Sequence, residues 1–295
     1  MNVHGLGIAL ATPFTPDQAL DPQALARLVR HVVAGGADFV VALGSTGEAA
    51  MLGEAERDRV VAVVREHRGT ATLFVGTGAS STAQAIAWTA RARDLGADGA
   101  LVVVPPYTRP TQAGIVAHFA AIARAVPGFP LIAYNVPARV GTNLQPATVR
   151  ELWAVPAVIA LKESSGDLQQ IARIAADVPA GRTLLAGDDP LTLPSIAVGA
   201  RGLVSVAGNV VPGAMRTLVQ TALAGDLPAA YAHHAHLLPL LDALGAEPNP
   251  IPIKAALAIA GIADAAVRLP LLPATASTCD RLRQALAPFT ELAHA

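Results

Sequence analysis

Short apolar segments alternate with longer segments of helical periodicity along most of this chain, and this alternation constrains the fold more than any other feature. Eight apolar, β-branched runs are predicted strands, at residues 7–12, 39–44, 73–76, 99–104, 131–135, 158–162, 183–187 and 202–207. Alanine-rich stretches with apolar residues at i, i+3 and i+4 lie between them, for example at residues 22–34, 54–67, 82–95 and 111–125. Continuous apolar strands joined by helices predict an α/β protein whose parallel sheet is covered on both faces.

A weak internal repeat favours closure of this sheet into a barrel. Segments 35–41, 96–102 and 199–204 each read as a glycine that ends a helix, a tight turn and a strand. Eight strands with helices after them predict a (β/α)8 barrel, the TIM barrel, over residues 1–225. Only helical stretches follow, at residues 229–244, 252–262 and 279–292, and they predict a C-terminal helical extension over residues 226–295.

Composition restricts the class of partner. The 295 residues are 53% hydrophobic and 15% charged, which excludes a disordered chain. A net charge of −1 offers no field that attracts nucleic acid or an anionic membrane, and no apolar run approaches the ~18 residues of a bilayer span. The single cysteine, Cys279, excludes a disulfide framework and a cysteine-based zinc site. We therefore expect a cytoplasmic protein that binds small molecules and no metal ion.

Lysine is scarce in this chain. Of the 21 lysines and arginines only two are lysines, Lys162 and Lys254. Lysine can lose its proton and form an imine with a carbonyl, whereas arginine can do neither. Lys162 ends an apolar strand, where a lysine can also simply extend to solvent, while Lys254 stands where a helix begins and is expected to be structural. Burial of Lys162 at the rim of an apolar barrel would favour its uncharged, nucleophilic form.

The carboxyl ends of the strands, where barrel enzymes carry their catalytic groups, hold further polar residues. Tyr134 lies near the end of the strand before the one that ends at Lys162. Residues 44–48, Gly-Ser-Thr-Gly-Glu, follow a strand and precede a helix, so their backbone N–H groups can form a nest that binds a carboxylate. The pattern predicts a catalytic lysine beside a tyrosine and an anion-binding loop.

Two other motifs have simpler structural explanations. Residues 76–78, Gly-Thr-Gly, resemble the start of a dinucleotide fingerprint but lack its third glycine, because Ser81 takes that place. Residues 188–190, Asp-Asp-Pro, fit a helix N-cap followed by proline better than a metal site.

Taken together, the motifs resemble those of the dihydrodipicolinate synthase / N-acetylneuraminate lyase family of pyruvate-dependent class I aldolases. The resemblance covers nearly the whole chain and rests on segments 7–14, 44–48, 134–141, 161–167, 187–189, 249–254 and 268–270. It implies a TIM-barrel lyase that joins pyruvate to a lysine as a Schiff base and needs no separate cofactor.

The resemblance implies a catalytic role for four residues. Lys162 forms the imine with pyruvate, and Tyr134 shuttles protons. Ser45 and Tyr107 extend a hydroxyl relay from Tyr134. In the family the residue at Tyr107 reaches into a neighbouring subunit's site, which implies a homodimer, commonly paired into a homotetramer.

Four more residues are implied to bind substrates. Thr46, with its loop amides, and the backbone of Val204 hold the pyruvate carboxylate and its surroundings, and Gly187 lines the same site. Arg139 binds the carboxylate of the aldehyde, a task that suits the two parallel donors of a guanidinium.

The sequence around Arg139 is similar to the synthase branch, which condenses pyruvate with L-aspartate-4-semialdehyde to 4-hydroxy-tetrahydrodipicolinate in lysine biosynthesis. Ser45 departs from this branch, where threonine is usual, but it keeps the hydroxyl. Residues 187–190, Gly-Asp-Asp-Pro, differ from the Gly-Tyr-Asp-Glu of the lyase branch. A lyase of the N-acetylneuraminate or 2-keto-3-deoxy sugar acid aldolase type, and a paralogue that binds 2-oxo acids without catalysis, remain alternatives.

Feedback inhibition by lysine is expected to be weak or absent. Pro106 replaces the second tyrosine that lysine-inhibited synthases carry before the relay tyrosine. Glu54, Arg57, Ser80 and Gln84 replace the His, His, Asn and Glu expected around that interface site. Half-inhibition at sub-millimolar lysine would contradict this prediction.

Overall fold

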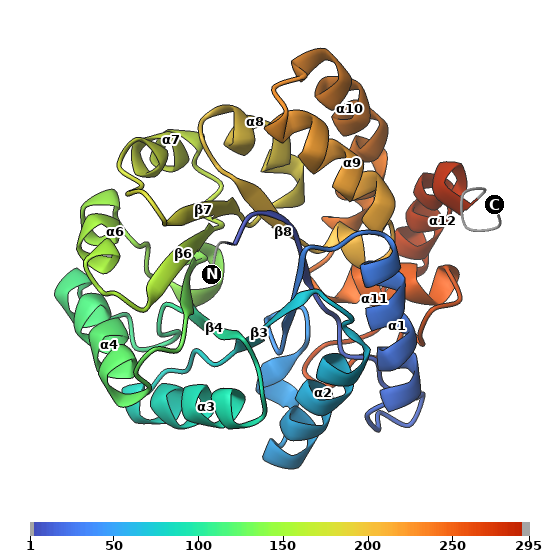
Figure 1. The fold of residues 1–295 in the computed structure, drawn as a ribbon. Helices are drawn as coiled ribbons and strands as arrows, with labels where there is room; N and C mark the ends of the chain where they lie inside the picture. The colour runs from blue at the N-terminus through green and yellow to red at the C-terminus, as the bar shows by residue number, and fades with distance from the viewer. Residues whose placement is uncertain (1–2, 291–295) are drawn as a thin grey trace.

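Eight parallel strands close into a barrel in the computed structural model, which describes residues 3–290 (Figure 1). The strands are β1 Gly5–Ala9, β2 Phe39–Ala42, β3 Thr72–Gly76, β4 Gly99–Val103, β5 Leu131–Asn135, β6 Val158–Glu163, β7 Thr183–Ala186 and β8 Gly202–Ser205. Strand β8 pairs with β1, with Gly202 beside Gly5 and Leu203 beside Leu6, and this pairing closes the ring. The predicted TIM barrel is confirmed.

Helices follow the strands and surround the barrel (Figure 1). They are α1 Pro22–Ala34, α2 Glu54–His67, α3 Thr82–Asp94, α4 Gln112–Ala125, the short α5 Pro137–Val140, α6 Pro146–Trp153, α7 Leu168–Ala176, α8 Thr192–Ala197 and α9 Pro212–Leu223. Three short 3-10 turns, η1 Ala49–Met51, η2 Asp189–Leu191 and η3 Ala207–Asn209, lie in the loops that leave β2, β7 and β8.

Local signals explain where these helices begin and end. The side chains of Asp21 and Ser81 accept hydrogen bonds from the first turns of α1 and α3, which satisfies N–H groups that a helix leaves free. Gly36, Gly96 and Gly199 have φ of 90°, 82° and 119°, so the predicted repeat of turn glycines is confirmed.

All eight predicted strands are present; β5 matches its predicted range, and the ends of the other seven differ by one to three residues. The largest difference is in β1, which was expected at residues 7–12 and runs from Gly5 to Ala9. After Leu10 the chain leaves the sheet, and the side chain of Asn209 accepts the N–H of Ala11 at 3.0 Å. A side-chain hydrogen bond thus replaces the hydrogen bonds between strands at this point. The apolar composition of the segment cannot predict where that replacement begins.

Aromatic rings fill part of the core where the strands carry glycine. Phe39 and Phe74 are buried and meet edge to face, with ring centroids 5.9 Å apart. A Cβ on Gly7 would lie 2.1 Å from the ring of Phe39, and one on Gly99 would lie 2.5 Å from the ring of Phe74. The two glycines are needed because the rings occupy the space of their missing side chains.

The C-terminal extension consists of α10 Leu227–Leu244, α11 Ile251–Ile259 and α12 Ala276–Thr290. In Figure 1 it lies at one side of the ring, beside α9 and α1. The expected division between residues 225 and 226 falls in the turn between α9 and α10, and it remains a prediction. Residues 291–295, which include the end of the last predicted helix, lie outside the described residues.

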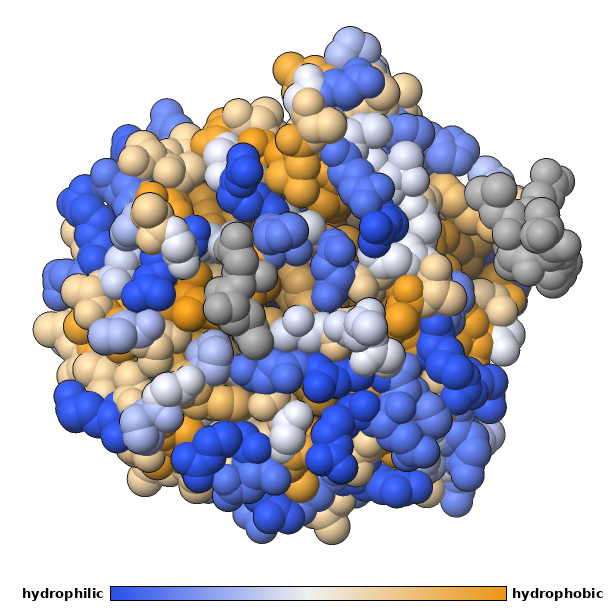
Figure 2. All heavy atoms as spheres, in the orientation of Figure 1, coloured by the Kyte–Doolittle hydropathy of each residue, from blue (hydrophilic) through white to orange (hydrophobic). Residues whose placement is uncertain are grey.

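The face of the molecule in Figure 2 mixes hydrophilic and apolar residues, and the hydrophilic ones are densest over α2 and α3. Among residues 3–290, no helix has the length and apolar character needed to cross a membrane.

Candidate active site

Lys162 and Tyr134 are opposite each other on neighbouring strands. Their Cα atoms are partners in the register of β5 and β6, so the two side chains extend to the same face of the sheet. Lys162 is 4% exposed and Tyr134 6%, and the Lys162 Nζ atom is 4.5 Å from the centroid of the Tyr134 ring. The structure therefore brings the predicted amine and the predicted phenol together in a buried place.

Glu163 faces the opposite side of β6 and fixes the end of the strand. Its carboxylate accepts hydrogen bonds from the Asn135 side chain at 3.0 Å and from the Ser165 N–H at 2.8 Å. Burial raises the pKa of Glu163, although the bonds from Ser165, Asn135 and Gln170 oppose that effect. Because these bonds hold the outward residue in place, the inward orientation of Lys162 is fixed as well.

Gly187 lies directly against Lys162. A Cβ at this position would be 2.9 Å from the Lys162 Cε and 1.9 Å from the Ser164 Oγ. The Ser164 hydroxyl is buried and has no hydrogen-bond partner among the described residues. A side chain at position 187 would thus displace the groups beside the amine.

At each end of the loop 44–48, one residue other than glycine has a positive φ, which such residues rarely adopt. Leu43, directly before the loop, has φ of 57°, and Glu48, the last residue of the loop, has φ of 51°. The Thr12 hydroxyl at the barrel rim donates to the Gly47 carbonyl at 2.7 Å, and the buried Thr46 hydroxyl accepts from the Asn249 side chain at 2.9 Å. The loop is therefore held on one side by Thr12, which lies beyond the end of β1, and on the other by the extension.

A cavity of about 630 Å³ opens beside this loop. Of the predicted site residues, Ser45, Tyr134 and Arg139 line it, whereas Lys162, Thr46, Val204 and Gly187 do not. Residues of α2, α3 and the segment 248–250 complete its wall. Tyr134 thus lines the cavity, and the Lys162 amine lies against the ring of Tyr134.

Arg139 lies on the short helix α5 at the mouth of the cavity. Its guanidinium Nη2 donates to the backbone carbonyl of Asn249 at 2.8 Å, and the remaining part of the side chain is exposed. This contact directs the guanidinium toward the segment that also bonds Thr46.

Asp189 has a role that sequence reasoning missed. The expected N-cap followed by proline is found in position only: Asp188 is the N-cap of η2 and Pro190 lies in its first turn, but no side chain caps this turn. The buried Asp189 carboxylate instead accepts from the Ser205 hydroxyl at 2.5 Å and from the Val206 and Ala207 N–H groups at 2.9 Å. Burial raises its pKa, and those hydrogen bonds oppose the rise. Asp189 therefore ties the end of β7 to the end of β8, which contains Val204.

Tyr107 does not join the other site residues within this chain. Its side chain is 92% exposed, and its φ of 72° is rare for a residue other than glycine. The backbone thus holds a large aromatic side chain out in solvent, away from the cavity of its own chain.

The positions tied to lysine inhibition lie near the cavity. Arg57, Ser80, Gln84 and Pro106 line it. Arg57 is buried, donates to the carbonyls of Ala49 and Gly76 at 3.0 Å, and stacks on Trp88 at 4.1 Å. The Arg57 guanidinium therefore occupies space at one of the positions where lysine-inhibited synthases are expected to carry histidine.

Comparison with known proteins gives consistent matches over the chain. The Dihydrodipicolinate synthetase family matches residues 2–288. A 4-hydroxy-tetrahydrodipicolinate synthase of Thermosynechococcus vestitus is 45% identical over 279 residues, 94% of each chain, and one of Thermomicrobium roseum is 46% identical over 286 residues, 97% of this chain and 94% of that one.

Solved structures agree with these relatives. Dihydrodipicolinate synthase from Thermotoga maritima superposes with a TM-score of 0.95 at 35% identity and covers 99% of this chain and 100% of that one. A structure described as the first monomeric dihydrodipicolinate synthase variant has a TM-score of 0.94 at 36% identity over 96% of this chain and 95% of that one. The chain belongs to the dihydrodipicolinate synthetase family.

Proposed function

We propose that this chain is a 4-hydroxy-tetrahydrodipicolinate synthase, a lyase that condenses pyruvate with L-aspartate-4-semialdehyde in lysine biosynthesis. The observation that carries the proposal is the buried Lys162 amine, 4.5 Å from the ring centroid of Tyr134, at the rim of a barrel of this family. Relatives named for this activity, at 45% and 46% identity, support the choice of acceptor.

The chemistry begins with attack of the Lys162 amine on the ketone carbon of pyruvate. Loss of water gives an imine, whose positive nitrogen acidifies the neighbouring methyl group. Removal of a methyl proton gives an enamine, and the enamine carbon then forms a bond with the aldehyde carbon of the acceptor. The imine itself accepts the electrons, so the reaction needs no external cofactor.

Proton transfer falls to the hydroxyl groups near the imine. Each step above moves a proton, and Tyr134 lies beside Lys162 and faces the cavity. Ser45 lines the same cavity and can extend the relay. Tyr107 is assigned to the relay of a neighbouring subunit, since it extends away from the cavity of its own chain.

The carboxylates of the two substrates are bound by different groups. The Thr46 hydroxyl, the amides of its loop other than those of Gly47 and Glu48, and the backbone of Val204 receive the carboxylate of pyruvate. The Gly47 and Glu48 amides already donate to carbonyls within the loop. Gly187 leaves room for the imine. Arg139, at the mouth, receives the carboxylate of the semialdehyde. The enzyme acts as a homodimer or homotetramer in the cytoplasm.

Borohydride reduction in the presence of pyruvate tests this function. We expect the wild-type protein to gain the mass of a reduced pyruvate adduct on the peptide that contains Lys162. Lys162→Arg keeps a positive charge but cannot form an imine, so this variant should stay folded and gain no mass. An adduct on another residue, or none at all, contradicts the proposal.

The acceptor is tested separately. Pyruvate with aspartate semialdehyde should give rapid turnover, whereas cleavage of sialic acid or of a 2-keto-3-deoxy sugar acid should be slow. Faster turnover of either sugar acid would assign the chain to the lyase or sugar acid aldolase type.

A further inference from the structure

The C-terminal extension is bonded to the 44–48 loop through a fully buried ion pair. The Glu48 side chain is 0% exposed and that of Lys254 1%, and the Lys254 Nζ donates to Glu48 Oε1 at 2.5 Å. The other carboxylate oxygen accepts the backbone N–H of Arg268 at 3.0 Å. Both oxygens of the last loop residue are thus bonded to the extension.

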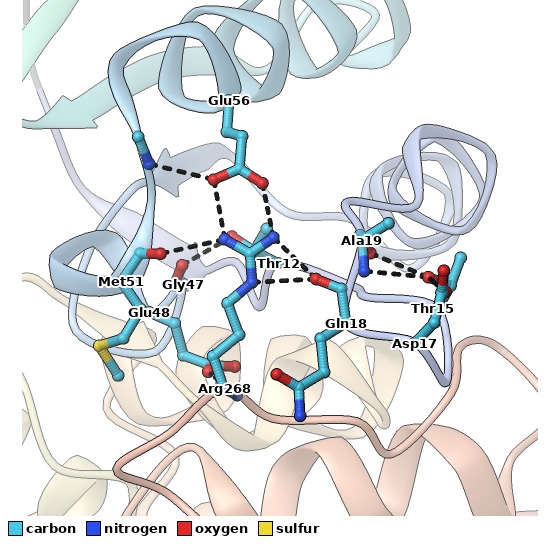
Figure 3. A network of polar contacts seen from close by, with 11 residues as sticks. Thr12, Thr15, Asp17, Gln18, Ala19, Gly47, Glu48, Met51, Glu56 and Arg268 are labelled. Atoms are coloured by element: carbon cyan, nitrogen blue, oxygen red, sulfur yellow. Dashed lines mark hydrogen bonds and ion pairs between the residues drawn. The ribbon is translucent and has the colours of Figure 1, made fainter.

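The groups around this pair hold it in one place. The Lys254 Nζ lies 3.9 Å from the ring centroid of Phe14, and the Arg268 guanidinium lies 4.2 Å from it. The Arg268 guanidinium forks onto the Glu56 carboxylate at 2.8 and 2.5 Å (Figure 3). It also donates to the backbone carbonyls of Met51 and Gln18. The extension is therefore also bonded to the segment before α1, to η1 and to the start of α2.

The same extension also holds the middle of the loop, through the bond of Asn249 to the Thr46 hydroxyl. Leu43, directly before the loop, and Glu48, its last residue, have φ of 57° and 51°. Such a backbone persists only where its surroundings hold it. An ion pair that merely docks α11 could lie anywhere along α11, but this one ends on the loop assigned to a substrate carboxylate.

We propose that Lys254, acting through Glu48, is a positioning residue that fixes the 44–48 loop and thereby sets the affinity of the site for the carboxylate of the oxo acid. This inference rests on the proposed function. Burial lowers the pKa of Lys254 to about 8, although the charge of Glu48 opposes that effect. The amine is therefore still protonated near neutral pH, and the ion pair is intact there.

The test compares Lys254→Met with the double variant Lys254→Met/Glu48→Gln. Removing one partner leaves a buried charge, so the single variant should lose stability, whereas the double variant removes both charges and should recover much of it. We expect both to need about tenfold more pyruvate for half-maximal adduct formation at Lys162. Both should raise KM for pyruvate to the same extent while kcat changes by less than about threefold.

The exposed pair Arg150–Asp177, 2.9 Å apart, provides the matched control. Arg150→Met should leave the half-saturating pyruvate concentration unchanged. If the double variant regains stability and also binds pyruvate like the wild type, the ion pair only stabilises the fold and the proposal is overturned. A fall in kcat at unchanged KM overturns it as well. If the wild-type protein forms no adduct, the proposed function itself is wrong, and the two failures are thus distinct.

Discussion

Gly187 shows how closely single residues are packed around the Lys162 amine. A methyl group at this position would meet the Lys162 Cε at 2.9 Å and the backbone carbonyl of Glu163 at 3.0 Å. Overpacking of this kind typically costs about 1–3 kcal/mol. We expect Gly187→Ala to slow adduct formation at saturating pyruvate at least ~10-fold, because Lys162 must move.

Gly213 is the matched control for this substitution. A Cβ there has nothing within 4 Å, so Gly213→Ala should form the adduct at the wild-type rate. Adduct formation at the wild-type rate in Gly187→Ala would show that Lys162 is free to shift.

Some of these residues could be predicted from the sequence and others could not. Neighbouring strands of a (β/α)8 barrel follow one another along the chain, so a lysine and a tyrosine at consecutive strand ends are expected to meet. The partners of Asp189 lie 16 to 18 residues away, and Glu48 lies 206 residues from Lys254. No local sequence pattern predicts such contacts, because they form only when the loops and the extension pack together in the folded chain.

At the level of elements, one carboxylate adds to the pairing of β7 with β8 by joining the loops that leave these strands. Asp189 accepts three hydrogen bonds from the residues that end and follow β8. In Asp189→Asn one oxygen becomes an NH2 group. If this group faces Val206 and Ala207, their N–H groups lose their acceptor, and if it faces Ser205, the proton of the Ser205 hydroxyl loses its acceptor. We expect the free energy of unfolding, measured in urea, to fall by about 1–3 kcal/mol.

Asp177 provides the control for this change. It forms an exposed ion pair with Arg150, so Asp177→Asn should alter the free energy of unfolding by less than about 1 kcal/mol. Equal effects of the two substitutions would mean that Asp189 does not hold the two strands together.

The sequence predicted which helices and strands exist more completely than it predicted where they begin and end. Helices α1 and α2 match the predicted ranges residue for residue, because their apolar period and their flanking residues agree. Strand ends differ where a side chain takes over from the ladder, as Asn209 does after β1. Tertiary bonds thus decide the ends of elements whose existence is clear from the local pattern.

At the scale of the whole molecule, the exposure of Tyr107 bears on assembly. If Tyr107 completes the site of a neighbouring subunit, a Tyr107→Phe chain and a Lys162→Arg chain should each have little activity alone. A dimer that contains one of each has one site with both wild-type groups, since Lys162 comes from one chain and Tyr107 from the other. With random pairing, equal co-expression should restore about a quarter of the wild-type activity per chain.

Co-expression of Lys162→Arg with Tyr134→Phe controls for this recovery. Lys162 and Tyr134 act in the same chain, on paired strands, so every site in a mixed dimer keeps one defect. That mixture should stay inactive. Activity is measured with pyruvate and aspartate semialdehyde on the whole mixture of dimers, purified through a tag that both chains carry. If the Tyr107→Phe mixture is no more active than the sum of its two parents, Tyr107 does not act across an interface. Its exposed position, with φ of 72°, would then need a different explanation.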